Sequence, residues 1–215
     1  MHIPDGILPA SVCIAGYGAT GAATWYCLRQ INRDRNPQAQ IPKASLLTAA
    51  FFVASWIHIP VPPVSVHLVL NGLLGTLLGY YAFPAILIGL FFQAIMFGHG
   101  GLTTLGVNAI MMGIPALIAY QIFQMRHWFK HRGGNGNITL SLFAFLAGAV
   151  GLGLAAAIFF VLVITTIPGE LDIATEKNAI YGLMLAHIPL MLIEGAFTAM
   201  LVTFLNRVKP ELIRD

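Results

Sequence analysis

Residues 44–97 read ASLLTAAFFVASWIHIPVPPVSVHLVLNGLLGTLLGYYAFPAILIGLFFQAIMF, and the division of this stretch decides how many membrane helices the chain forms. It is apolar nearly throughout but is broken by a proline-rich run at 60–63 and by Pro84. A membrane-spanning helix needs about 20 apolar residues, and fewer where the membrane thins locally. The stretch can therefore hold two long spans, or three short ones near 44–59, 66–81 and 83–97.

The composition places the whole chain in a membrane. Hydrophobic residues make up 58% of the 215 residues and charged residues only 9%, whereas a soluble domain carries roughly 25% charged residues. So few charges cannot cover a globule in water, and a net charge of +3 is too small for a nucleic-acid surface. Outside the stretch 44–97, apolar segments predict further spans near 9–28, 107–125, 138–167 and 179–206.

The positions of the basic residues favour three spans in 44–97, because cytoplasmic loops of membrane proteins collect Lys and Arg. With three spans and the N-terminus outside, only Lys177 of the 11 basic residues faces outward. With two spans, one of the basic groups 29–43 and 126–132 must face outward. We therefore predict an all-α polytopic transmembrane bundle of seven helices, with the N-terminus outside and the C-terminus inside. A single membrane domain should cover residues 1–215.

The N-terminus itself could chelate a metal ion. No positively charged segment typical of a cleaved signal peptide precedes the first span, so we expect Met1 to begin the mature chain. A free α-amine, the amide nitrogen of His2 and Nδ1 of His2 can close two fused chelate rings, which leaves one position of a square plane for another imidazole. Nitrogen donors in that geometry indicate Ni(II) or Cu(II), with Co(II) as a third option. Residues 1–8 should then fold into the bundle.

His67 is the expected fourth ligand. It follows the proline-rich loop and is predicted to open an apolar helix at the outer mouth of the bundle. Its simpler interpretation is a boundary histidine that is hydrogen-bonded to a carbonyl group. The predicted topology favours the ligand, because an outward N-terminus and an outward His67 can meet.

Two further polar groups lie within apolar sequence. The glycine-rich segment 97–108 carries His99 and Asn108 and either caps the metal or forms a tight interhelical turn. His187 and Glu194 lie on one face of the last span, where ionisable residues are candidates for function. The alternative for Glu194 is a protonated carboxyl group that bonds to a neighbouring helix.

Four blocks of the sequence resemble the CbiM/NikM family, the substrate-binding subunits of energy-coupling-factor (ECF) cobalt and nickel importers. The blocks are Met1-His2-Ile3-Pro4-Asp5-Gly6, Ser65 to Gly75, Phe97 to Asn108 and His187 to Gly195, so the resemblance extends over the whole chain. It implies that Met1, His2 and His67 hold the ion. From their positions in the sequence we also expect Ser65, Asn71, His99 and Asn108 to support or cap these ligands.

The same resemblance implies partners: a transmembrane coupling subunit, cytoplasmic ATPase subunits and, in many systems, a small accessory membrane subunit. It also implies location in the cytoplasmic membrane of a bacterium or archaeon, with no cofactor beyond the transported ion. The chain has no GxxxxGK[ST] loop for ATP, so we expect no enzymatic activity of its own. The competing interpretations are a stand-alone permease or channel and, with less support because HExxH is absent, an intramembrane enzyme.

Overall fold

The computed structural model describes residues 2–61, 64–130, 136–166 and 173–213. This part of the chain is almost entirely helical, and its α-helices are α1 (Ala10–Ile31), α2 (Ile41–Ala54), α3 (Asn71–Leu78), α4 (Ala82–Phe97), α5 (Leu105–Lys130), α6 (Gly136–Thr165) and α7 (Ile173–Val208). Short 3-10 turns occur at η1 (Pro37–Gln40), η2 (Gly79–Tyr81) and η3 (Pro210–Leu212). One small antiparallel hairpin joins β1 (His58–Val61) to β2 (Val64–His67).

Helical stretches of membrane-spanning length confirm a multi-pass membrane protein. Within the described residues, four such stretches are long and apolar enough to cross a membrane: Asn71–Phe97, Leu105–Phe129, Gly136–Thr165 and Tyr181–Val208. Helices suit this environment because they satisfy their own backbone hydrogen bonds where water is absent. The number of spans and the side of the membrane that each terminus faces remain predictions.

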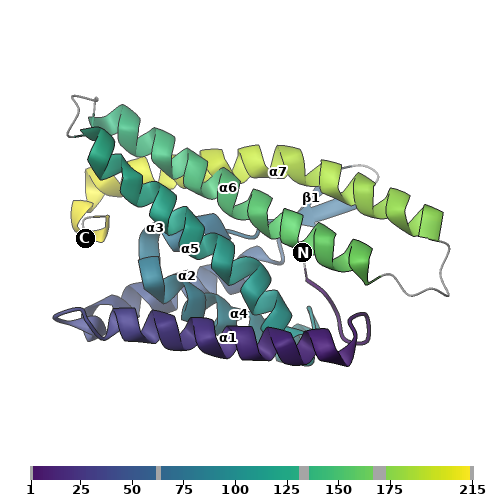
Figure 1. Ribbon diagram of the computed structural model, residues 1–215. Helices are drawn as coiled ribbons and strands as arrows, with labels where there is room; N and C mark the ends of the chain where they lie inside the picture. The colour runs from purple at the N-terminus through teal and green to yellow at the C-terminus, as the bar shows by residue number, and fades with distance from the viewer. Residues whose placement is uncertain (1, 62–63, 131–135, 167–172, 214–215) are drawn as a thin grey trace.

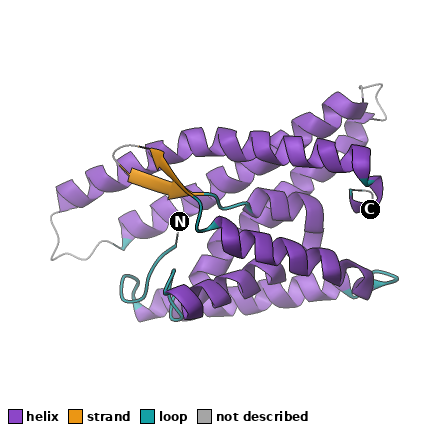
Figure 2. Ribbon diagram, turned by 180° about the vertical axis from the view of Figure 1, so that it is seen from behind, coloured by secondary structure: helices purple, strands orange, loops and turns teal. Residues whose placement is uncertain are grey.

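The two ends of the bundle differ in what they contain. In both overall views the β-hairpin and the N-terminal segment lie toward one end and the C-terminus lies at the other (Figures 1 and 2). At the C-terminal end, Lys43 donates to the carbonyl oxygen of Leu212 at 3.2 Å and Arg126 donates to that of Ile213 at 3.2 Å. Basic residues from separate helices, α2 and α5, therefore gather at the end opposite the N-terminal segment.

The middle of the stretch 44–97 differs from the prediction. Residues 64–67 form strand β2, and the next helix begins at Asn71 rather than at His67. Helix α3 has only eight residues, all of them buried, and its length of about 12 Å cannot cross a hydrocarbon core of about 30 Å. The segment 66–81 is therefore not one continuous helix: its regular part is limited to α3 and η2, and α3 lies between α6 and α1 in Figure 1, inside the bundle.

Glycines allow α3 to occupy this central position. Gly72 of α3 meets the backbone of α6, where an added Cβ would lie 2.7 Å from the Cα of Gly148. One turn later, a Cβ on Gly75 would overlap the carbonyl oxygen of Ala116 in α5. Small residues permit such close backbone contact between membrane helices. On α6, four small buried residues form the face that permits this close packing: Ala144, Gly148, Gly151 and Ala155.

Replacing Gly75 with alanine should destabilise the protein, because the new methyl group meets backbone that cannot rotate away. We expect a loss of about 2 kcal/mol, typical of overpacking, and a thermal midpoint in detergent lower by roughly 5 °C. The matched control is Gly21→Ala in α1, where nothing lies within 4 Å of the new Cβ. That variant should keep or slightly raise the midpoint, and equal midpoints for the two variants would contradict the close contact of α3 with α5.

Candidate metal site

The N-terminal segment is fixed in the bundle by the peptide groups of Ile3. The Asn108 side chain of α5 accepts a hydrogen bond from the Ile3 N–H at 3.0 Å and donates one to the Ile3 carbonyl oxygen at 3.0 Å. The Thr104 hydroxyl donates to the same carbonyl oxygen at 2.6 Å. The Ile3 side chain is only 1% exposed. These contacts fix the backbone one residue after His2, and Asn108 therefore supports the segment rather than an imidazole ring.

Asp5 forms a second attachment, to the loop that follows α4. Its carboxylate accepts hydrogen bonds from the backbone N–H groups of Leu102 at 3.2 Å and Thr103 at 2.9 Å, and from the Thr103 hydroxyl at 2.5 Å. The bond from the Thr103 hydroxyl is the main cause that lowers the pKa of Asp5 below its usual value. Gly101 is required here, because a Cβ at this position would overlap the Asp5 carboxylate.

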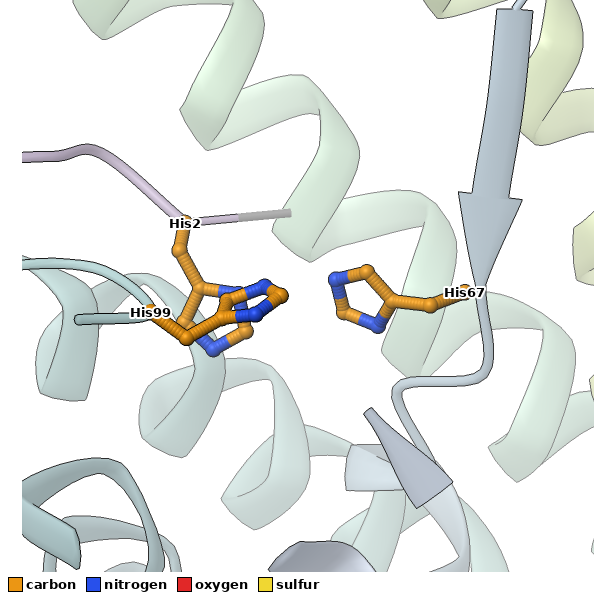
Figure 3. Close-up of side chains that lie close together, drawn as sticks. All are labelled: His2, His67 and His99. Carbon is orange, nitrogen blue, oxygen red and sulfur yellow. The ribbon is translucent and has the colours of Figure 1, made fainter. Parts of the chain in front are cut away.

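Three histidines from three separate segments converge beside this attachment (Figure 3). His2 comes from the N-terminal segment, His67 from the end of β2 and His99 from the loop after α4. One ring nitrogen of each lies within 4.8 Å of those of the other two. The ring centroids are 5.2 Å apart for His2 and His67, 4.3 Å for His2 and His99, and 5.4 Å for His67 and His99. Three imidazoles at this separation can hold a transition-metal ion.

The backbone around His67 fixes which nitrogen it presents. Its Nδ1 lies 3.0 Å from the carbonyl oxygen of Leu68. A carbonyl oxygen can only accept, so Nδ1 must carry the proton and Nε2 keeps its lone pair. The next residues are tied to α7, because Glu194 accepts hydrogen bonds from the backbone N–H groups of Val69 and Leu70. Leu70 adopts the left-handed conformation with φ of 57°, which turns the chain from β2 into α3.

Gln93 contacts His2, a role that the sequence analysis missed. Its Oε1 lies 2.8 Å from Nε2 of His2, and its side chain is fully buried in α4. It is the sole polar side chain in Ala82–Phe97. A lone polar residue in an apolar membrane helix is a signal of function, and that signal was present in the sequence.

The environment of His2 keeps its imidazole neutral. Burial lowers the pKa of His2 well below 6.5, and the neighbouring rings of His67 and His99 lower it further. The hydrogen bond that Nε2 of His2 donates to Oε1 of Gln93 raises the pKa but does not offset these effects. A metal ion binds a neutral imidazole, so His2 is in its ligand form at neutral pH without first losing a proton.

The remaining predicted residues lie away from the three rings or outside the described structure. Met1 and the side chain of Ser65 lie outside the described part. Asn71 donates to the backbone carbonyls of Met112 at 3.3 Å and Gly151 at 2.9 Å, so its hydrogen bonds tie α3 to α5 and α6.

The intramembrane pair does not form a site of its own in the described structure. Nδ1 of His187 bonds to the Leu183 carbonyl oxygen of its own helix at 2.7 Å. Both carboxyl oxygens of Glu194 accept from backbone N–H groups at the start of α3. Glu194 therefore bonds to a neighbouring element of the bundle, as the alternative interpretation expected, and its contacts support the segment that follows His67; its protonation state stays a prediction.

Comparison with known proteins agrees with this architecture. Residues 2–212 match the family model CbiM, described as "Cobalt uptake substrate-specific transmembrane region". A protein of Haemophilus influenzae named "Putative metal transport protein" is 35% identical over 99% of this chain and 97% of its own length. The "Fused nickel transport protein NikMN" of Rhodobacter capsulatus is 30% identical over 99% of this chain and 64% of its own length.

A solved structure has the same fold. The crystal structure of a transition metal transporter superposes with a TM-score of 0.75 at 23% identity, over 97% of this chain and 93% of that one. The match of the family model over nearly the whole chain decides the assignment: this protein belongs to the CbiM family, the substrate-specific transmembrane component of cobalt uptake.

Proposed function

We propose that this chain binds Ni(II) or Co(II) at its N-terminus and delivers the ion for uptake as the substrate-binding subunit of an ECF importer. The observation that carries the proposal is the convergence of His2, His67 and His99 within 4.8 Å. Among the described residues this is the one such group of His, Cys, Asp or Glu side chains. The membership of the chain in a metal-uptake family supports the same conclusion.

The proposed ligands are the α-amine of Met1, the amide nitrogen and Nδ1 of His2, and Nε2 of His67. The amide nitrogen is shared by the two fused rings, so Nε2 of His67 would lie opposite it and next to Nδ1 of His2. Neighbouring ligands in a square plane lie about 3 Å apart when each metal–nitrogen bond is about 2.0–2.1 Å. One ring nitrogen of each histidine lies within 4.8 Å of those of the other two, so the rings of His2 and His67 would have to approach each other by up to about 2 Å. The tautomer of His67 presents the nitrogen that this arrangement needs.

His99 covers the proposed plane from one side. The rings of His2 and His67 are nearly parallel, with an interplanar angle of 27°, whereas the His99 ring stands at 76° and 88° to them. The His99 ring is therefore nearly perpendicular to the other two rings and does not lie in a common plane with them. We therefore assign His99 to the cap over the ion and not to the four in-plane ligands.

Transport would need partner subunits that this chain does not supply. We propose a transmembrane coupling subunit and cytoplasmic ATPase subunits, with a small accessory membrane subunit in some assemblies. In this arrangement the chain lies in the cytoplasmic membrane of a bacterium or archaeon with its metal site facing outward. The concentration of basic residues at the opposite end of the bundle, including Lys43 and Arg126, supports that orientation.

Adding two alanines before Met1 should strongly weaken Ni(II) binding. The extension converts the Met1 amine into an amide and moves the free amine away from the His2 chelate; a single added residue is avoided because an imidazole at position 3 would form a new chelate with the free amine. We expect affinity measured by isothermal titration to fall by more than about 100-fold, beyond the 10–100-fold typical of losing a group that only supports a ligand. The control is two alanines added after Asp215, and equal affinities for the two extended proteins would rule out the terminal amine as a ligand.

Replacing His67 with alanine should weaken Ni(II) and Co(II) binding by at least about 100-fold, because one in-plane ligand is removed. The control is His127→Ala, which changes an exposed histidine of α5. That variant should bind within about twofold of the native protein. Titration calorimetry of both variants with each metal provides the comparison, and losses of similar size would leave His67 without a ligand role.

Ni(II) binding at pH 7 should release about two protons per ion. One comes from the α-amine, since a free α-amine is mostly protonated at pH 7, and one from the His2 amide, which must ionise to bind. The His2 imidazole contributes none at this pH, because its pKa is lowered well below 6.5 and the ring is already neutral. Calorimetry in two buffers of different ionisation enthalpy measures the number released. A value near zero would exclude both the amine and the amide as ligands.

A further inference from the structure

We infer that Gln93 is a positioning residue for the metal site: it fixes the tautomer and the ring orientation of His2 so that Nδ1 faces the ion. This inference rests on the proposed function, since it assigns a role within the same site. It concerns a residue of α4 that supplies no atom to the ion. The hydrogen bonds of the Gln93 amide nitrogen and amide oxygen determine how this residue acts on His2.

The orientation of the Gln93 amide follows from its second partner. Its Nε2 lies 3.5 Å from the carbonyl oxygen of Phe51, in the last turn of α2. The final carbonyls of a helix have no partner further along that helix, and a carbonyl oxygen can only accept. The amide nitrogen must therefore face Phe51. This leaves Oε1 facing His2, at 2.8 Å from its Nε2.

The amide in turn decides the state of the His2 ring. Oε1 of Gln93 can only accept, so Nε2 of His2 must carry the proton in this hydrogen bond. In a neutral imidazole the other nitrogen, Nδ1, then holds the lone pair. Nδ1 is also the nitrogen that closes a six-membered chelate ring with the His2 amide. Gln93 thus selects the one tautomer of His2 that can complete the proposed chelate.

The tautomer of His67 is also fixed by a hydrogen bond, but the proton lies on the other ring nitrogen. The Leu68 carbonyl oxygen holds the proton of His67 on Nδ1, which leaves Nε2 for the ion. The two imidazoles therefore present different nitrogens, each selected by an acceptor on the far side of its ring. Metal-binding histidines commonly donate their second N–H to such an acceptor, and loss of the acceptor typically weakens metal binding 10–100-fold.

The test uses the full-length protein in detergent with imidazole ¹⁵N labelling, and compares Gln93→Met with Gln93→Glu. Methionine keeps the size and removes the acceptor, whereas glutamate keeps the acceptor. Gln121→Met is the matched control, because Gln121 is exposed on α5. In the metal-free native protein we expect the His2 proton on Nε2, with slow exchange against water. Gln93→Glu and Gln121→Met should retain that signal, and Gln93→Met should lose the slow exchange.

Ni(II) titration of the same proteins gives the second measurement. Gln93→Met should bind 10–100-fold more weakly, and Gln93→Glu and Gln121→Met should bind within about threefold of the native protein. A native His2 with its proton on Nδ1 would overturn the inference without any variant. Unchanged affinity in Gln93→Met would also overturn it while leaving the proposed function intact. Conversely, a native protein that shows the Gln93-dependent Nε2 proton but binds no Ni(II) or Co(II) would refute the proposed function while the control of the His2 tautomer by Gln93 would still hold.

Discussion

The hydrogen bonds between Asn108 and the two peptide groups of Ile3 are the interaction on which the site depends. A chain terminus is ordinarily poorly ordered, because few contacts offset the entropy of fixing it. Here a buried amide pairs with both polar groups of one residue, Thr104 adds a third bond, and the Ile3 side chain fills the core. His2 is thereby placed against α4 although no helix or strand contains it.

The position of His67, on the other side of the site, depends on the buried carboxyl group of Glu194. Glu194 in α7 accepts from the backbone N–H groups that precede α3, where the chain is neither strand nor helix. Irregular backbone is tolerated in a membrane only where other protein groups satisfy it. The Glu194 carboxyl group thus allows the short helix α3 to begin inside the bundle, a few residues after His67. Packing of α3 through Gly72 and Gly75 and the placement of His67 are consequences of the same arrangement.

Composition and charge were sufficient to predict the class of fold, because the preference of a long segment for lipid or water depends on its average hydropathy and charge. They also led to His2 and His67, since chelation by a terminal amine is local chemistry. They did not predict that residues 64–67 form a strand, because an apolar run of that length suits a strand as well as a helix. Gln93 was missed for a different reason: the sequence shows it as the lone polar residue of an apolar segment, but its partner is 91 residues away, so no local pattern indicates what it contacts.

The sequence separations at the site have a consequence for biosynthesis. His2 leaves the ribosome well before the partners of its segment, Gln93 and Asn108, whose bonds span 91 and 105 residues of sequence. Closing so long a loop has an entropic cost that the contacts offset only when both ends exist. The N-terminal segment must therefore stay undocked until the start of α5 has been synthesised, and the ion-binding pocket cannot form before that point.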